Sequence, residues 1–484
     1  MERLVSNKIS IPIVLLALSL GIAYLTSVGG ELIPVAVISV SVGAVFIALL
    51  FRNPIWGLYL TLSFSFLIML ITREISPRVQ VGLGVEILLI LTWIVAFFNK
   101  IKANWKAANS DVTALVILWF IISVFEIVNP SAPNVMGWFY EVRTTALNLL
   151  LIIPLTMILF NKERHLDVFL KIIIAFSLVA ALNGIKQLMG GMLPGEMAFL
   201  KANTGTHFIN GKLRVFSFFT DAGQFGASQA HVALICFILS AAPITLWKRA
   251  VLVAIGVVLC YGMLISGTRG ALFVFAGVLI GLFLTKKFKL LFLGVMMMIG
   301  LVAFLKFTTI GQGNYHIRRL RTAVNPEQDA SYIVRLNSQE RLRTYLAARP
   351  FGGGLGTIGG NGQEFNPNGF LATVEPDSYW VKVWAMYGIV GLVIWFGIMM
   401  YIMGKCCGII WNIRDPVLRI KLVALVSGTI GIFIASYGNE VINRTPSSII
   451  VYMSWAIIFV ASKWDKPDVL EAKEEKRPSA VYLN

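Results

Sequence analysis

Long, uninterrupted apolar runs recur along the whole chain, separated by shorter polar segments. Each run holds about 17–25 residues, the length that an α-helix needs to cross the hydrocarbon core of a bilayer. The strands of a membrane β-barrel would alternate between polar and apolar residues, which runs such as Val35–Leu50 and Leu290–Phe307 do not. The pattern predicts an all-α, polytopic membrane helical bundle of about fourteen transmembrane helices, near residues 11–28, 32–51, 55–71, 84–98, 113–129, 144–160, 167–189, 222–242, 249–265, 270–285, 289–309, 377–403, 417–437 and 447–462.

The polar segments between the runs are of two kinds. Placing the N-terminus in the cytoplasm puts every short, strongly basic loop on the cytoplasmic side, as the positive-inside rule requires. The opposite side carries one long polar and glycine-rich segment, Gly311–Pro376. We therefore expect transmembrane helices 1 to 11 in residues 1–309, a large extracytoplasmic loop over 310–376 that acts as a lid or builds a site, helices 12 to 14 in 377–463, and a cytoplasmic tail over 464–484.

The composition supports a membrane protein. Of the 484 residues, 57% are hydrophobic and 13% charged, whereas soluble domains carry about 25% charged residues. The formal net charge of +17 is typical of a nucleic-acid-binding protein, but most of the basic residues lie in the short loops, which favours the positive-inside explanation and argues against nucleic acid as a partner. The four cysteines lie in or beside apolar runs, so they indicate no extracytoplasmic disulfide framework.

Several sequence motifs for cofactors and nucleophiles are missing. The chain has no GxxxxGK[ST], HExxH or GxSxG sequence, and its four histidines are widely spaced. The glycine-rich run Gly352–Gly360 follows no predicted strand and lies on the side where nucleotides are absent, so a nucleotide-binding role is disfavoured. We expect no metal and no cofactor, and the energy for any reaction then comes from the substrate or an ion gradient.

Three arginines on the predicted outer side stand out. Arg214 precedes the span that opens at Asp221, Arg269 lies in the five-residue turn Ser266–Gly270, and Arg335 begins a helix-like stretch. An arginine at the edge of a bilayer is costly unless it is paired or hydrated. Several converging guanidinium groups would bind a pyrophosphate and stabilise its charge as it leaves. The alternative is that each arginine extends to the interface and anchors its helix. Arg341 is a secondary candidate that equally fits a solvated helix face, as do Arg318, Arg319, Arg321 and Arg343.

Acidic residues precede two of the predicted spans. Asp377 lies in Glu375-Pro-Asp-Ser-Tyr-Trp380, directly before an apolar run, and it is a candidate general base or orienting carboxylate for an incoming sugar hydroxyl. Glu375 is the reserve candidate. Asp221 is a secondary candidate at the start of another span. Aspartate before an apolar run is also a common helix N-cap, so capping remains the alternative for Asp377 and Asp221.

These motifs, taken together, resemble the O-antigen ligase/polymerase superfamily. The resemblance rests on Arg214…Phe218, Ser266-Gly-Thr-Arg-Gly270, Arg335 fifteen residues before Pro350, Pro350-Phe-Gly-Gly-Gly-Leu-Gly356 and Tyr387-Gly-Ile-Val-Gly-Leu392. It implies a GT-C-like glycosyltransferase of the bacterial inner membrane with a large periplasmic loop. Such an enzyme takes a glycan from undecaprenyl pyrophosphate and passes it to a glycolipid or lipid-linked acceptor, among membrane lipids and without metal. The resemblance assigns Arg214, Arg269 and Arg335 to the donor pyrophosphate.

The chain departs from the family pattern at two positions. Family members usually carry a histidine, the proposed base, where this chain has Pro376-Asp377-Ser378, and many carry a glutamate where it has Tyr387. The missing histidine favours a polymerase over a ligase. The rival class is a lipid-linked oligosaccharide flippase or transporter, in which ionisable residues lie near the membrane midplane. Here the ionisable residues near the spans cluster toward the outer ends, among them Glu86, Glu126, Arg143, Lys186, Lys382 and Glu440.

Overall fold

The computed structural model describes residues 47–75, 81–99, 103–209, 211–310 and 330–465, together with Gly43, Gly313, Arg318 and Arg321. The predicted span 11–28, most of 32–51 and the tail beyond Asp465 lie outside the described residues. Within them the chain is almost entirely helical, with one two-stranded antiparallel hairpin as its sheet. The predicted all-α membrane fold is confirmed.

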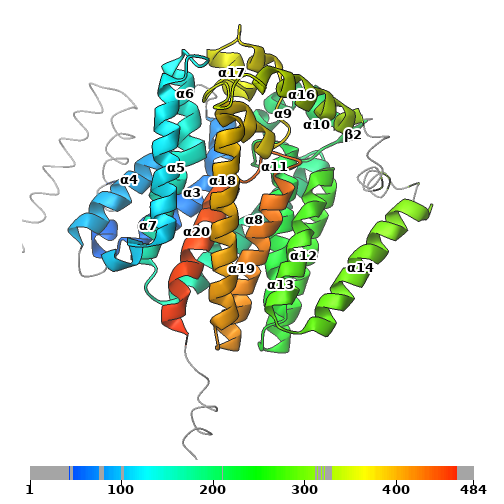
Figure 1. Cartoon of the computed structure of the whole chain (residues 1–484). Helices are drawn as coiled ribbons and strands as arrows, with labels where there is room; N and C mark the ends of the chain where they lie inside the picture. Colours follow the sequence, from blue (N-terminus) through cyan, green and yellow to red (C-terminus); the bar gives the residue numbers. More distant parts are fainter. Residues whose placement is uncertain are drawn as a thin grey trace, which may run out of the picture.

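The helices follow the apolar runs in chain order (Figure 1). The first part of the bundle comprises α3 (Ile55–Glu74), α4 (Leu83–Phe98), α5 (Asp111–Phe125), α6 (Val135–Val142), α7 (Asn148–Leu159) and α8 (Glu163–Leu188). The middle comprises α9 (Pro194–Ala202), α10 (Thr204–His207), β1 (Phe208–Ile209), β2 (Lys212–Leu213), α11 (Ala222–Ser240), α12 (Leu246–Ile265), α13 (Gly277–Leu284) and α14 (Phe288–Phe307). The last part comprises α16 (Ala330–Leu346), α17 (Gly359–Phe365), α18 (Tyr379–Asn412), α19 (Pro416–Ala435) and α20 (Ser447–Ala461).

Short helical turns join several of these elements. They are the 3-10 helices η1 (Trp105–Ala108), η2 (Glu126–Val128), η4 (Arg269–Ala276), η6 (Phe370–Thr373) and η7 (Ser462–Trp464), and a π-helical turn η3 (Arg143–Leu147) between α6 and α7. Among the described residues, nine helical segments are long and apolar enough to cross a membrane, and three shorter apolar helices accompany them. Between the predicted spans 167–189 and 222–242, for which no helix or strand was predicted, the chain folds into α9, α10 and the hairpin.

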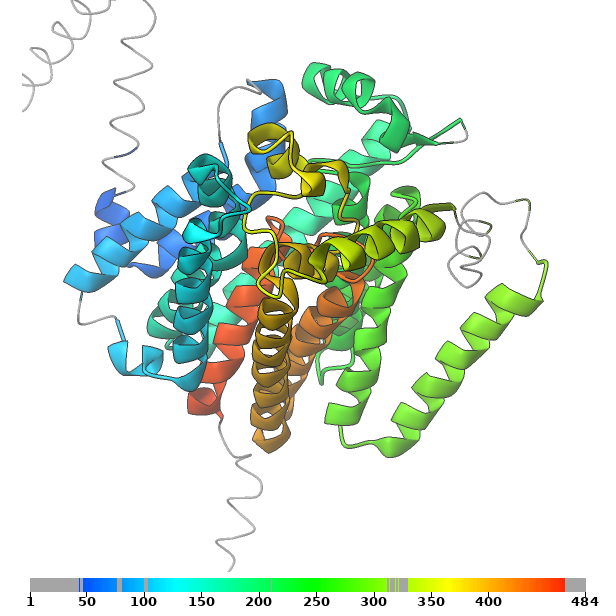
Figure 2. The same cartoon turned by 45° about the horizontal axis from the view of Figure 1, so that its top comes forward.

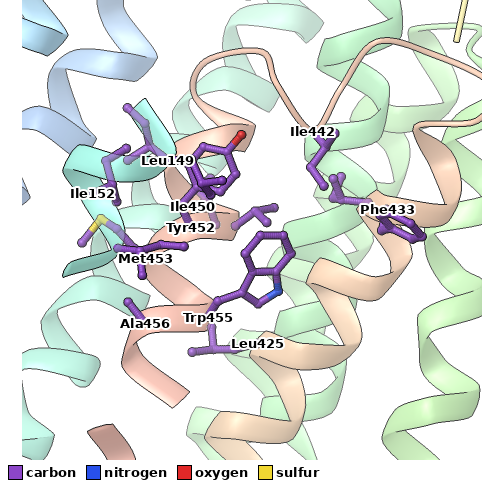
Figure 3. Packing of buried hydrophobic residues seen from close by; sticks show 14 of the residues in the cluster. Leu149, Ile152, Leu425, Phe433, Ile442, Ile450, Tyr452, Met453, Trp455 and Ala456 are labelled. Atoms are coloured by element: carbon purple, nitrogen blue, oxygen red, sulfur yellow. The ribbon is translucent and has the colours of Figure 1, made fainter. Parts of the chain in front are cut away.

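The core of the bundle surrounds α11 and α20, the two most deeply buried spans. Trp455 of α20 is fully buried and packs among residues of α7 and α19, including Ile152 and Leu425 (Figure 3). Ile442, from the connection between α19 and α20, lies in the same cluster. Since side chains of distant segments interlock here, the ends of α19 and α20 are held in fixed positions relative to the other spans.

The two ends of the bundle differ. We call the "loop face" the end that carries residues 190–221, 266–270, 330–378 and 436–446; Figure 2 shows α16 and α17 lying across it. The opposite end carries the basic connections. There Lys421 pairs with Glu163 and with Asp167, each at 2.7 Å, and the Arg419 guanidinium donates to the Thr285 carbonyl oxygen. The basic loops and the long segment therefore lie at opposite ends, as the charge pattern predicted.

α18 is interrupted at Gly388, and the glycine-rich run fills the interruption. Gly388 has a φ of +67°, and a Cβ there would overlap with the Pro350 carbonyl oxygen. The backbone N–H groups of Gly353 and Gly354 donate to the carbonyl oxygens of Ala385 and Met386, each at 2.9 Å. A break in a membrane helix leaves backbone groups that need partners. The run Pro350–Gly356 supplies them, so its glycines serve close backbone packing.

Candidate functional site

Arg214 is held beside the turn that carries Arg269. Its backbone follows the β1–β2 hairpin, and its N–H donates to the His207 carbonyl oxygen at 2.7 Å. Its guanidinium donates to the Ser266 carbonyl oxygen (3.4 Å), to Thr268 Oγ1 (3.3 Å) and to the Thr206 carbonyl oxygen (3.0 Å). The structure thus brings Arg214 to the Arg269 turn although 55 positions separate the two arginines in the chain.

The Arg269 turn is fixed against the start of α11. Thr268 Oγ1 donates to the Ala222 carbonyl oxygen at 2.9 Å, and the Ser266 hydroxyl donates to the Met263 carbonyl oxygen. Ser266 and Thr268 are buried, whereas Arg269 is half-buried and begins η4. The rigid turn therefore presents Arg269 at the edge of the bundle on the loop face.

Asp221 caps α11 at the same place. Its Oδ1 accepts a hydrogen bond from the Gln224 N–H at 2.9 Å, so the helix-cap alternative is confirmed for this residue. A Cβ built on Gly223 would lie 2.8 Å from Asp221 Oδ1 and 3.3 Å from Asn439 Oδ1. Asp221 therefore lies beside the 436–446 connection.

Arg335 and Asp377 meet at the start of α18. Arg335 Nε and Asp377 Oδ2 are 3.4 Å apart, and 31% and 49% of the two side chains remain exposed. The capping alternative for Asp377 is wrong, because Ser378 is the N-cap residue and its hydroxyl accepts from the Val381 N–H. Asp377, one residue earlier, does not cap α18 and pairs with Arg335 of α16.

The reserve and secondary candidates lie further along the same segment. Glu375 is exposed, and its Oε1 accepts from Gln363 Nε2 of α17 at 2.6 Å. The Arg341 guanidinium donates to Thr373 Oγ1 at 3.0 Å and lies 5.4 Å from the centre of the Phe370 ring. Their contacts are with α17 and η6, so neither residue is joined to the Arg214 group by these bonds.

The connection 436–446 lies between the two arginine groups. The Tyr379 N–H, at the start of α18, donates to the Ser436 carbonyl oxygen at 2.9 Å. On its other side, a Cβ on Gly270 would overlap with the Asn439 amide. This short connection on the loop face is therefore flanked on one side by Arg214 and the Arg269 turn, and on the other by Arg335 and Asp377.

A buried ionic network, which the sequence did not predict, lies next to this connection. Lys382 Nζ lies 2.9 Å from Glu141 Oε1 and 3.4 Å from Glu440 Oε2, and Arg444 Nη2 lies 2.8 Å from the same Glu440 oxygen. Glu141 and Lys382 are buried, and Asn361 of α17 donates to the second Glu141 oxygen. The only signal in the sequence was the presence of ionisable residues at the ends of apolar runs.

The network sets the charge of the 436–446 connection. Burial by itself would raise the pKa of Glu440, but the positive charges of Lys382 and Arg444 outweigh it and hold the pKa below its usual range. Glu440 is thus ionised at neutral pH, and its interactions tie the connection to α18 and, through Lys382, to α6. A charged network of this kind keeps the 436–446 connection between the two arginine groups rigid.

Tyr387 occupies the position where many family members carry a glutamate. It is buried, its hydroxyl lies 2.7 Å from the Ser123 hydroxyl, and its ring packs on Trp119 of α5. These contacts give Tyr387 a packing role between α5 and α18. Within the described residues, His, Cys, Asp and Glu form no group of three or more that is placed to hold a metal ion.

Fold and site together define a multi-pass, all-α membrane protein with a polar, arginine-bearing loop face. Residues 254–396 match the family model described as O-antigen ligase, which confirms that this part of the chain is similar to the O-antigen ligase/polymerase superfamily. The matched segment contains Arg269, Arg335, Glu375, Asp377 and the break at Gly388, while Arg214 precedes it. Among curated proteins, no significant match was found.

Proposed function

We propose that this protein transfers a glycan from undecaprenyl pyrophosphate to an acceptor glycan on the periplasmic face of the inner membrane. The observation that carries the proposal is that Arg214 is hydrogen-bonded to the turn bearing Arg269, inside a chain of the O-antigen ligase type. Guanidinium groups form bidentate hydrogen bonds with phosphate oxygens, which suits a diphosphate better than any neutral ligand.

The orientation follows from charge. The basic connections lie opposite the loop face, so the positive-inside rule assigns the loop face to the periplasm. Nucleotide sugars are absent there, and an activated sugar has to arrive already attached to a lipid. Undecaprenyl diphosphate fits this requirement, because its diphosphate lies at the membrane surface, where Arg214 and Arg269 are.

The chemistry is a single displacement. The acceptor hydroxyl oxygen forms a bond to the anomeric carbon of the donor, while the bond from that carbon to the diphosphate oxygen breaks. The electron pair leaves with undecaprenyl diphosphate, and Arg214, Arg269 and Arg335 stabilise the charge that grows on it. The hydroxyl proton passes to Asp377, which is exposed and lies beside Arg335. Glu375 is the reserve base.

The residues at the site favour transfer over transport. The buried charges Glu141 and Lys382 lie in α6 and in the first turn of α18, both at the loop-face end of their spans. A flippase or transporter would place such charges toward the middle of the membrane. The acceptor is a second lipid-linked repeat in a polymerase or a lipid A–core in a ligase, and the absence of the family histidine favours the polymerase.

One reconstitution tests these alternatives together. Purified protein in vesicles is given a lipid-pyrophosphate oligosaccharide, with or without a lipid A–core acceptor, and the products are separated by mass. A polymerase lengthens the donor glycan without the acceptor, a ligase requires the acceptor, and a flippase moves the donor across the bilayer unchanged. Arg343→Ala is the matched control for Arg269→Ala, because Arg343 is exposed on α16 and pairs only weakly with Glu340. Unchanged donor in every arm would refute glycosyl transfer.

A further inference from the structure

A recess lies on the loop face, and Arg214, Arg269 and Arg335 are not among the residues that line it. Its volume is about 430 Å³, and its walls come from the 130–133 connection, the C-terminal part of α16, and residues 357–371. We call it the aromatic cleft and define it by Ser131, Tyr345, Phe365, Asn368 and Phe370. None of the side chains that line it is charged. The guanidinium groups of Arg341 and Arg349 lie over two of its rings, 5.4 Å from the centre of Phe370 and 4.1 Å from the centre of Tyr345. The lining itself favours an uncharged ligand over the diphosphate.

The aromatic cleft has two aromatic walls. The rings of Tyr345 and Phe370 stack with their centres 4.6 Å apart and an angle of 16° between their planes, so each ring covers one face of the other. Phe365 stacks in the same way on Tyr140 of α6, at 5.2 Å and 11°, so its second face is the one that can meet a ligand. The negative face of an aromatic ring attracts polarised C–H groups. A sugar ring presents such C–H groups on its flat faces and hydroxyl groups around its edge.

Polar groups lie between the aromatic walls. Among the residues that the structure describes, the Ser131 hydroxyl and the Asn368 side-chain amide make no hydrogen bond to another residue, and Asn368 is exposed. Both groups donate and accept hydrogen bonds, as sugar hydroxyls do. Uncharged aromatic walls with a few polar groups between them are typical of sites that select a neutral, polar ligand.

The aromatic cleft is built on a fixed frame. The Asn366 amide donates to the Gly356 carbonyl oxygen, and the Asn134 amide donates to the Phe365 carbonyl oxygen, each at 2.9 Å. Thr357 Oγ1 donates to the Gly354 carbonyl oxygen. Gly354 is in turn hydrogen-bonded to the broken part of α18. The cleft is therefore anchored to the membrane bundle and keeps its shape before a ligand arrives.

α16 connects the aromatic cleft to the proposed reaction centre. Arg335 pairs with Asp377 near one end of the helix, and Tyr345 lines the cleft ten residues later, which is about 15 Å along the helix axis. We propose that the aromatic cleft binds an uncharged sugar unit of a glycan chain, at a distance of several sugar units from the bond that is made. The identification of that chain as donor or acceptor rests on the proposed function, but sugar binding by itself does not.

The test measures binding without catalysis. The probe is the oligosaccharide released by mild acid from the host's own surface polysaccharide, which carries no lipid and no pyrophosphate. Saturation-transfer NMR with the full chain in nanodiscs should show this oligosaccharide bound to the wild type, and Phe370→Ala should weaken binding at least tenfold. Asn368→Ala, an exposed change that disturbs no hydrogen bond among the described residues, should weaken it about threefold to tenfold. Phe351→Ala is the control, because Phe351 is exposed and lies outside the cleft.

The results separate this inference from the proposed function. Arg269→Ala should bind the free oligosaccharide as well as the wild type does while failing to transfer glycan. In the reconstituted reaction, Asn368→Ala should raise the KM of the acceptor if the acceptor chain fills the cleft, or the KM of the donor if the donor chain does. No binding by the wild type, or wild-type binding by both Phe370→Ala and Asn368→Ala, would overturn the glycan cleft whatever the activity is.

Discussion

The two arginine regions of the loop face are held in different ways. Arg214 is half-buried, and its guanidinium is fixed by two backbone carbonyl oxygens and the Thr268 hydroxyl. Arg335 is paired with one exposed carboxylate at 3.4 Å, on a helix that lies across the ends of the spans (Figure 2). An exposed ion pair of this kind contributes about 0–1 kcal/mol. Arg214 is thus held in place by contacts within the protein, whereas Arg335 makes one weak ion pair that, under the proposed function, a phosphate would replace.

The difference assigns separate tasks to the two regions. Donors that are oriented in advance stabilise a developing charge without reorganisation during the reaction. If donor binding breaks the ion pair between an arginine and a carboxylate, the carboxylate can then accept a proton. Under the proposed function, the Arg214 region would bind the diphosphate and the Arg335 region would couple donor binding to activation of the acceptor.

The largest expected effect is at the fixed region. Arg214→Lys and Arg269→Ala should each lower the transfer rate by about 10²–10³-fold, because a lysine lacks the planar fork that matches phosphate oxygens. The measurement is glycan transfer by purified protein at saturating donor. Arg343→Ala should transfer at the wild-type rate, and full activity of Arg214→Lys would show that Arg214 only supports the turn.

Asp377 is expected to affect the rate more than donor binding. Asp377→Asn keeps the shape of the side chain but cannot accept the proton, so the rate should fall by about 10²-fold while donor KM changes less than about threefold. Glu375→Gln should have little effect if Asp377 is the base. Equal rates for Asp377→Asn and the wild type would leave Asp377 as a partner of Arg335 alone.

Arg335 should tolerate a lysine better than Arg214 does. Because Arg335 makes one loose ion pair, Arg335→Lys should retain activity within about tenfold of the wild type. The ratio of the two lysine variants, measured in the same assay, directly tests the difference between the two regions. A loss as large as that of Arg214→Lys would mean that both arginines are held equally tightly.

The break in α18 should be sensitive to a single methyl group. Gly388→Ala puts a Cβ onto the Pro350 carbonyl oxygen at a positive φ, which should cost at least about 1–3 kcal/mol and lower the unfolding temperature in detergent. Gly404→Ala, on the same helix and with open space around it, should be neutral or slightly stabilising. Equal unfolding temperatures would show that the glycine-rich run adapts.

The smallest expected effect is a pH dependence of the Arg214 hairpin. Burial lowers the pKa of His207, which packs against Phe199 and Phe216, below its usual 6.5. A lowered pKa means that its stabilising contribution is present above pH 6.5 and is lost as the pH falls below that value. Hydrogen exchange of residues 203–209 and 211–216 should therefore quicken between pH 7 and pH 5.5, and His207→Gln should remove most of that change.

The sequence predicted the spans well and the contacts between them poorly. An apolar run of membrane length has to fold as a helix, because its backbone groups find no water in the bilayer to bond with. For this reason α11, α19 and α20 begin within a few residues of the predicted positions. The break at Gly388 carries no such signal, because the residues on both sides of it are apolar. The segment that packs into the break begins at Pro350, nearly forty residues earlier in the chain.

The candidate site shows the same limit. Acidic residues before apolar runs indicated the helix starts at Asp221 and near Asp377. The sequence did not show that the hydroxyl of Ser378, and not Asp377, caps α18. The partners of Lys382 come from α6 and from the 436–446 connection, and only tertiary packing brings them together. The assignment of Arg214, Arg269 and Arg335 to the diphosphate stays a prediction for the assays above.

The backbone bonds at Gly388 also determine how α16 can move. Residues 350–356 are hydrogen-bonded to α18, so any tilt of α16, the helix before them, has its pivot near Pro350. Arg335 lies about 16 Å from the hinged end of α16, so a tilt of only about 10° swings its guanidinium by about 3 Å. That displacement is comparable with the 3.4 Å between Arg335 Nε and Asp377 Oδ2, so a modest rocking of α16 is enough to break or to form this ion pair.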